Sequence, residues 1–179
     1  SRKAYFGLRP YSNPYYIYSR GDVKYQYYSG KKEHFSVTAR VMAQLSSSVL
    51  IPIEQFGMGG INSVRGYVAR EVNVDDALVF NLDVMTPRIS ILKYIKNKYR
   101  NIDRLSGVLF LDIGNGWLLR TIPGEPAHTF MAGIGPGIRY DLWDNIYTRF
   151  DLGVRLSGIP YGALYDSPVR FYFSVIGTY

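Results

Sequence analysis

Apolar and polar residues alternate along most of this 179-residue chain. In one segment, for example, Val37 and Val41 alternate with polar residues such as Thr38 and Arg40. Successive side chains of a β-strand point to opposite faces, so this alternation predicts strands with one apolar and one polar face. The pattern predicts about eight strands, at residues 3–9, 15–28, 33–45, 67–86, 106–118, 129–142, 146–156 and 169–179.

Most of these predicted strands are longer than the strands of soluble sheets, which usually have about five or six residues. A strand that crosses a membrane needs about 9–11 residues. The polar faces are rich in charge and in glycine, as suits a wet and crowded lumen. A soluble β-sandwich would also alternate, but these features favour a transmembrane antiparallel β-barrel. The charges predicted to point into its lumen are Arg139, Arg149, Asp151 and Arg155.

The last predicted strand, 169–179, ends on an aromatic residue, Tyr179. A C-terminal strand with an outward apolar face resembles the signal by which the barrel-assembly machinery recognises outer-membrane barrels. The resemblance implies that this machinery is a partner. The same alternation predicts a set of residues that face lipid, namely Phe80, Leu82, Phe150, Leu152, Phe171 and Phe173.

The connections between the predicted strands alternate in length. Residues 29–32 and 144–145 are short turns, whereas 46–66, 119–128 and 157–168 are long loops. Bacterial barrels keep short turns on the periplasmic side, so the long loops are predicted to be extracellular. One periplasmic connection is long and basic, because segment 88–104 carries Arg88, Lys93, Lys96, Lys98, Arg100 and Arg104. We interpret it as a solvated loop or short helix, with contact to an anionic lipid or a partner as the alternative.

Composition narrows the class further. Hydrophobic residues make up 47% of the chain, aromatic residues 16% and charged residues 20%. No apolar run approaches the roughly 20 residues of a membrane helix. Cysteine is absent, so there is neither a disulfide framework nor a thiolate metal site. The net charge is +7, but the basic residues are scattered and form no stripe, which argues against nucleic acid as a partner.

One predicted loop carries a motif: residues 54–67 read EQFGMGGINSVRGY. It resembles the signature loop of the outer-membrane protein assembly and secretion superfamily. Within that superfamily it is most similar to two-partner-secretion transporters (haemolysin activation/secretion, TpsB), whose loop runs from E-Q-F through a glycine pair to V-R-G-Y. The functional loop residues implied are Gly59, Gly60, Val64, Arg65, Gly66 and Tyr67.

A second motif lies downstream, where residues 110–114 read FLDIG and resemble the family's F-x-D-x-G strand. The resemblance, which covers about residues 50–179, implies that the loop folds back into the lumen. It also implies that Arg65 contacts a barrel wall formed by Phe110, Asp112 and Gly114. A charge inside a barrel is costly unless it is paired, and an Arg–carboxylate pair can be bidentate. Without the motif, Arg65 would be interpreted as a solvated loop charge.

The activity implied is export of a secreted partner protein across the outer membrane of a Gram-negative-type cell envelope, without a cofactor. Eight strands closed on themselves would leave a lumen too narrow for an inserted loop. An open half-barrel would expose two unpaired edges to the lipid bilayer. We therefore expect residues 1–179 to be the C-terminal half of a sixteen-stranded barrel. The other half would lie elsewhere or come from a second copy, and no POTRA domain is visible in the chain.

Three alternatives remain open. A barrel-assembly insertase of the same superfamily would share the loop, and a passive porin would share the barrel. A small lipid-modifying enzyme would need a nucleophile beside a base, but His34 and His128 are predicted at opposite rims. The glycines of 133–137 recur at period two on a strand and so differ from a phosphate-binding loop. The adjacent Asp75 and Asp76 are interpreted as solvated acids, and no catalytic, cofactor or metal site is predicted.

Overall fold

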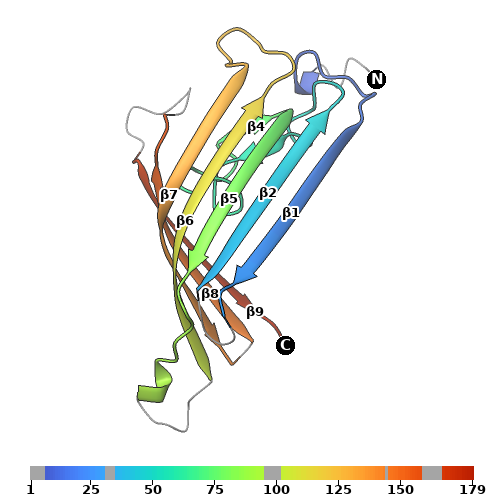
Figure 1. Cartoon of the computed structure of the whole chain (residues 1–179). Coiled ribbons are helices and arrows are strands. Elements are labelled where there is room, and N and C mark those ends of the chain that lie inside the picture. The colour runs from blue at the N-terminus through green and yellow to red at the C-terminus, as the bar shows by residue number, and fades with distance from the viewer. Residues whose placement is uncertain (1–6, 31–34, 95–101, 144, 159–166) are drawn as a thin grey trace.

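The chain folds as a single curved, antiparallel β-sheet in a computed structural model that describes residues 7–30, 35–94, 102–143, 145–158 and 167–179. The order of its seven strands is β1-β2-β5-β6-β7-β8-β9, and β3 and β4 form a separate pair. Figure 1 shows the sheet curling, so that β8 and β9 pass behind β5 and β6. The elements are β1 (Tyr18–Tyr28), β2 (Ser36–Ser46), β3 (Phe56–Met58), β4 (Val72–Val74), β5 (Asp76–Met85), the 3₁₀ turn η1 (Leu92–Tyr94), β6 (Asp103–Trp117), β7 (His128–Leu142), β8 (Ile146–Arg155) and β9 (Val169–Gly177).

The fold is all-β, as the alternation predicted, and its two faces differ as expected. On β6, Phe110 and Asp112 are buried on the concave face, whereas Leu109 points outward and is 57% exposed. On β9, Phe171 and Phe173 point outward and are 71% and 69% exposed. An apolar face that is left open on this scale is typical of strands that contact lipid.

Strand register brings polar residues and glycines of neighbouring strands into one band across the concave face. Asp112 lies opposite Asn81 of β5 and also opposite Gly133 of β7. On the far side of β7, Asp151 of β8 lies opposite Tyr172 of β9. Strand pairing therefore brings residues that are distant in sequence together on the concave face of β5 to β9.

The hydrophobic core lies on the concave side, between the sheet and the loop that contains β3 and β4 (Figure 1). It forms there because this loop folds back over β2, β5 and β7 and covers the inward apolar residues that the strands present. Water is thereby excluded from only part of the concave face. The buried members are Met42, Phe56, Met58, Val64, Tyr67, Val74, Ala77, Val79 and Met131.

Six of the eight predicted strands are present with ends that differ by at most three residues, as at 15–28 against the observed Tyr18–Tyr28. The prediction of one continuous strand over 67–86 was wrong. Residues 67–71 belong to the loop, β4 pairs with β3, and β5 begins only at Asp76. The strand is interrupted at Asp75. The buried carboxylate of this residue accepts hydrogen bonds from two loops.

Asp75 was interpreted as a solvated acid, and that interpretation was wrong. Its side chain is fully buried and accepts hydrogen bonds from the backbone N–H of Leu50 at 2.9 Å and of Leu119 at 3.0 Å. Gln55 donates a third bond of 3.0 Å from its side chain. Through these three hydrogen bonds, Asp75 joins the loops that contain Leu50 and Leu119 to the beginning of β5.

The predicted first strand, 3–9, is not found among the described residues. Residues 3–6 lie outside them, and Gly7 and Leu8 have helical backbone. Arg9 instead reaches the β6–β7 loop, where its Nη2 lies 3.2 Å from a carboxylate oxygen of Glu125. This ion pair joins the described residues before β1 to the loop between β6 and β7.

Part of the basic segment 88–104 forms an ordered turn. Asp103 is buried and accepts hydrogen bonds from the Ser90 hydroxyl at 2.5 Å and the Ile91 N–H at 2.8 Å. This arrangement agrees with the interpretation of a loop with a short helix, η1, although Lys96, Lys98 and Arg100 fall outside the described residues. None of the helical segments described has the length and hydropathy that a membrane crossing requires.

The alternation of faces makes a testable prediction at β9. A nitroxide label attached at Phe173→Cys should be relaxed mainly by oxygen dissolved in lipid, because this position lies on the outer face. The same label at Ser174→Cys should respond mainly to a water-soluble nickel complex, because Ser174 lines the concave cavity. The measurement is power-saturation electron paramagnetic resonance, and reversed accessibilities would refute the assignment of the faces.

Candidate functional site

The predicted functional loop turns sharply before it reaches the sheet. Gly60 donates its N–H to the carbonyl of Val64 at 3.0 Å and has a φ of 94°. Gly66 follows with a φ of 102°. These values lie in the left-handed region, which glycine adopts without the steric cost that a Cβ brings. The two turns direct the intervening Arg65 toward the sheet.

Arg65 is held by Asp112 in a bidentate pair. Its Nε lies 2.6 Å from one carboxylate oxygen of Asp112 and its Nη2 lies 2.7 Å from the other. The backbone N–H of Arg65 donates a third bond to the same carboxylate at 2.9 Å. Arg65 is 2% exposed and Asp112 is fully buried. The contact implied by the resemblance is therefore present, and it fixes both the backbone and the side chain of the loop.

Three further groups of the sheet surround the Arg65 guanidinium. Asp83 of β5 accepts a bond from Nη2 at 2.6 Å, and Asp151 of β8 lies 3.6 Å from Nη1. The ring of Phe110 lies under the guanidinium, 3.6 Å from its central carbon to the ring centroid. A cation over an aromatic face gains electrostatic stabilisation in a desolvated site. Arg65 thus reaches three strands with one side chain.

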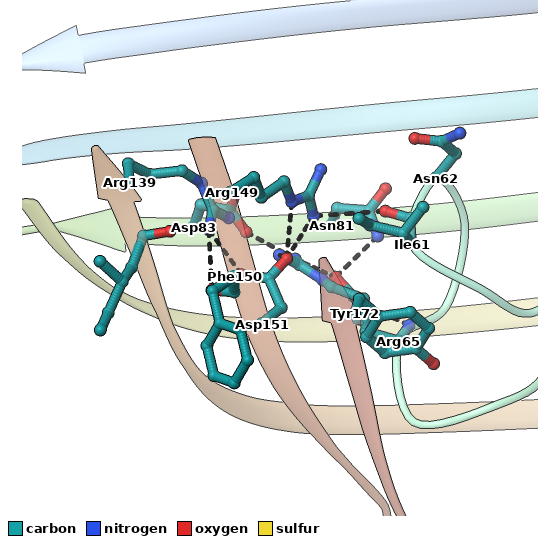
Figure 2. A network of polar contacts seen from close by, with 12 residues as sticks. Ile61, Asn62, Arg65, Asn81, Asp83, Arg139, Arg149, Phe150, Asp151 and Tyr172 are labelled. Carbon is teal, nitrogen blue, oxygen red and sulfur yellow. Dashed lines mark hydrogen bonds and ion pairs between the residues drawn. The ribbon is translucent and has the colours of Figure 1, made fainter. Parts of the chain in front are cut away.

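Two other predicted lumen arginines converge on Asp151, as Figure 2 shows. Arg139 of β7 and Arg149 of β8 each place a guanidinium nitrogen 2.6 Å from this buried carboxylate. With Arg65, three guanidinium groups then face three carboxylates, those of Asp83, Asp112 and Asp151. The charges balance, which lowers the cost of burying them.

The fourth predicted lumen charge, Arg155, lies beside Tyr67 of the signature loop. Its guanidinium carbon is 5.8 Å from the centroid of the Tyr67 ring. The Tyr67 hydroxyl in turn donates or accepts hydrogen bonds at Ser157 and at the backbone of Ala132. The end of the signature loop is therefore fastened to β7 and to the residues that follow β8.

The wall behind the loop is made of glycine where the two backbones meet. A Cβ at Gly133 of β7 would overlap the carbonyl oxygen of Arg65, and one at Gly153 of β8 would overlap the N–H of Gly66. At the predicted wall residue Gly114, a Cβ would lie 2.8 Å from a methyl group of Val64. Any side chain at these positions would push the loop away from the sheet.

Four residues of the site were not predicted as site residues. Asn81 donates to Asp112 at 2.7 Å and to the Ser63 carbonyl at 2.6 Å. The hydroxyl of Tyr172 contacts the backbone of the loop from β9. Asp75 and Asp83 complete the set. Alternation places Asn81 and Asp83 on the polar face of their strand, but no sequence signal specifies their partners.

The remaining concave surface forms an open cavity of about 1040 Å³ beyond Arg65. Both signs of charge line it, with Lys24, Arg40 and Arg88 near Asp22 and Asp141. Asp22 and Arg40 form an ion pair with each other across β1 and β2. A surface of mixed charge suits water and a polar polypeptide better than an apolar ligand.

The described residues contain no group of three or more His, Cys, Asp or Glu placed to hold a metal ion. His34 lies outside the described residues. The ring of His128 lies 5.3 Å from that of Trp117, and its Nε2 is 3.1 Å from the side-chain oxygen of Asn115. These contacts give His128 a structural environment at the end of the sheet.

The close approach at Gly133 makes a prediction. Gly133→Ala should displace the signature loop, because the new methyl group would overlap the Arg65 carbonyl. Amide hydrogen exchange of residues 64–67 should then rise about tenfold or more. Gly21→Ala on β1 is the control, since a Cβ there has no neighbour within 4 Å. Unchanged exchange in a folded Gly133→Ala protein would contradict the observed packing of the signature loop against β7.

The sequence matches the model of one protein family, the Omp85 superfamily domain, over residues 2–176. No curated protein sequence matches the chain. Omp85 proteins are outer-membrane β-barrel proteins that act in protein secretion or assembly. The matched residues include the loop of Arg65 and all of the described sheet except Gly177, the last residue of β9. The chain therefore belongs to the Omp85 superfamily.

Proposed function

We propose that this chain forms part of an outer-membrane pore that exports a partner protein, as two-partner-secretion transporters do. The observation that carries the proposal is the seat of the loop, which Arg65 holds against Asp112 on the concave face. The loop's sequence, from Glu-Gln-Phe to Val-Arg-Gly-Tyr, resembles that of the family. Membership of the superfamily supports residence in the outer membrane and a role in protein secretion or assembly.

In this proposal the seated loop closes the path through the barrel, and export requires the loop to move. Asp83 is the carboxylate partner of Arg65 that is most accessible from the open cavity, with a side chain 24% exposed. A positively charged segment of cargo entering the cavity would compete with Arg65 for Asp83. Ion pairs also weaken when water reaches them, because the effective dielectric constant rises. The mechanism needs no cofactor.

The barrel wall is completed by further strands in this proposal. Within the described residues, β1 and β9 are the two edges of the sheet. Edges left unpaired in lipid would leave backbone groups without hydrogen bonds. We infer that β1 and β9 pair with additional strands, to about sixteen in all, supplied by the rest of the protein or by a second copy. The outward aromatic face of β9 supports recognition by the barrel-assembly machinery.

A barrel-assembly insertase is the second candidate, and the superfamily includes both activities. An exporter and an insertase differ in the defect that loss of the protein should cause. Deleting the gene of an exporter should remove a large protein from the culture medium and leave other outer-membrane barrels intact. Loss of those barrels with normal secretion would favour the insertase. Mass spectrometry of the medium and of isolated outer membranes distinguishes the outcomes.

The role of Arg65 is tested by complementing that deletion with variants. Arg65→Ala should reduce export about tenfold or more, because Asp112 and Asp151 would lose a buried counter-charge and the loop its seat. The amount of folded barrel in the membrane should fall less, since the strand pairing is unchanged. Export is read from the amount of the identified partner in the medium, normalised to the barrel.

Arg70→Ala is the matched control. Arg70 belongs to the same loop, but its guanidinium donates to the carbonyls of Pro52 and Gln55, which are also loop residues. Arg70→Ala removes one positive charge, as Arg65→Ala does, but it removes hydrogen bonds within the loop and leaves the bonds of Arg65 to the sheet in place. Equal losses of export in the two variants, or a loss in Arg65→Ala that only follows the amount of barrel, would refute the proposed role of the seat.

A further inference from the structure

Tyr172 differs from its neighbours on β9 in where it points. Phe171 and Phe173 lie on the outer face and are largely exposed, whereas Tyr172 turns its ring to the concave face (Figure 2). There it reaches the signature loop, more than a hundred residues earlier in the chain. Tyr172 lies on the same face of β9 as Ser174, which lines the concave cavity, so its ring is placed to contact groups inside the curved sheet.

The hydroxyl of Tyr172 bridges two consecutive residues of the loop backbone. It accepts a hydrogen bond from the N–H of Gly66 at 2.8 Å and donates one to the carbonyl of Tyr67 at 2.6 Å. A tyrosine hydroxyl has one hydrogen and acceptor lone pairs, so both roles are filled at once. Phenylalanine would keep the ring but would leave a donor and an acceptor of the loop without this partner.

Through Tyr172, the signature loop is bonded to a strand at the edge of the described sheet. In the described part of the chain, β9 pairs with β8 alone, and Tyr172 lies opposite Asp151. Asp151 is itself next to Arg65, at 3.6 Å. Two adjacent loop residues, Arg65 and Gly66, therefore contact the two members of one register pair, and the second member belongs to an edge strand.

We propose that Tyr172 is a positioning residue that couples the seating of the signature loop to the position of the edge strand β9. When Arg65 leaves Asp112, the bonds of Gly66 and Tyr67 to Tyr172 are lost as well, and β9 is freed from the loop. Coupling between two sites is reciprocal, so movement of β9 equally weakens the seat. The inference rests on the proposed role of the loop as a movable closure.

The test uses Tyr172→Phe in the intact protein that contains this chain, purified in detergent, with amide hydrogen exchange as the readout. Exchange should rise about tenfold at residues 64–67 and in β9, as expected for the loss of two hydrogen bonds. Exchange in β1 and β2 should stay unchanged. Tyr25→Phe on β1, an exposed tyrosine, is the matched control and should change neither region.

Reciprocity supplies a second measurement that a purely structural role would not reproduce. Arg65→Lys should raise exchange in β9, although the ion pairs of Arg65 with the described residues are made to Asp83, Asp112 and Asp151, on β5, β6 and β8. In a Tyr172→Phe background the same change should add little in β9. A uniform rise over all strands, or an additive effect of the two variants, would overturn the coupling. Export is not read here, so failure of the coupling is distinguishable from failure of the proposed function.

Discussion

The burial of one positive charge governs the arrangement of this structure. Arg65 sits on a loop, yet its guanidinium is almost fully removed from solvent between Asp112, Asp83 and Asp151. A charge in such a place is tolerated only with close counter-charges and directed hydrogen bonds. The carboxylates come from β5, β6 and β8, so the pairing constrains the register of three strands as well as the path of the loop.

The backbone of the loop can pass close to the sheet because the sheet has glycine at the points of contact. Gly133 and Gly153 carry no side chain where the loop backbone passes, and a Cβ at either would overlap it. The close approach of the backbones brings both the N–H and the guanidinium of Arg65 within hydrogen-bonding distance of Asp112. The same approach lets the hydroxyl of Tyr172 bond to two backbone groups of the loop.

The concave face is divided into a dry part and a wet part, and Arg65 lies at the boundary. On one side, Met58 and Val64 pack in the apolar core beneath the loop. On the other side, a cavity of about 1040 Å³ is lined by charges of both signs. Placing the ion pairs at this boundary keeps them strong while the loop is seated and leaves Asp83 accessible from the cavity. The proposed movement of the loop depends on this division of the concave face.

The sequence by itself determined the all-β class and the face of each major strand, because the period of two is a local property. It also placed Arg139, Arg149 and Asp151 on the inner face by parity, whereas the pairing of Arg65 with Asp112 came from the resemblance of the two motifs to the family. The tertiary structure alone decided the contacts of Asp83 and Tyr172 and the break at Asp75. Those contacts depend on the register between strands and on where a returning loop crosses them. Register and loop path are set by packing between residues far apart in the chain, which an alternating pattern along one strand does not encode.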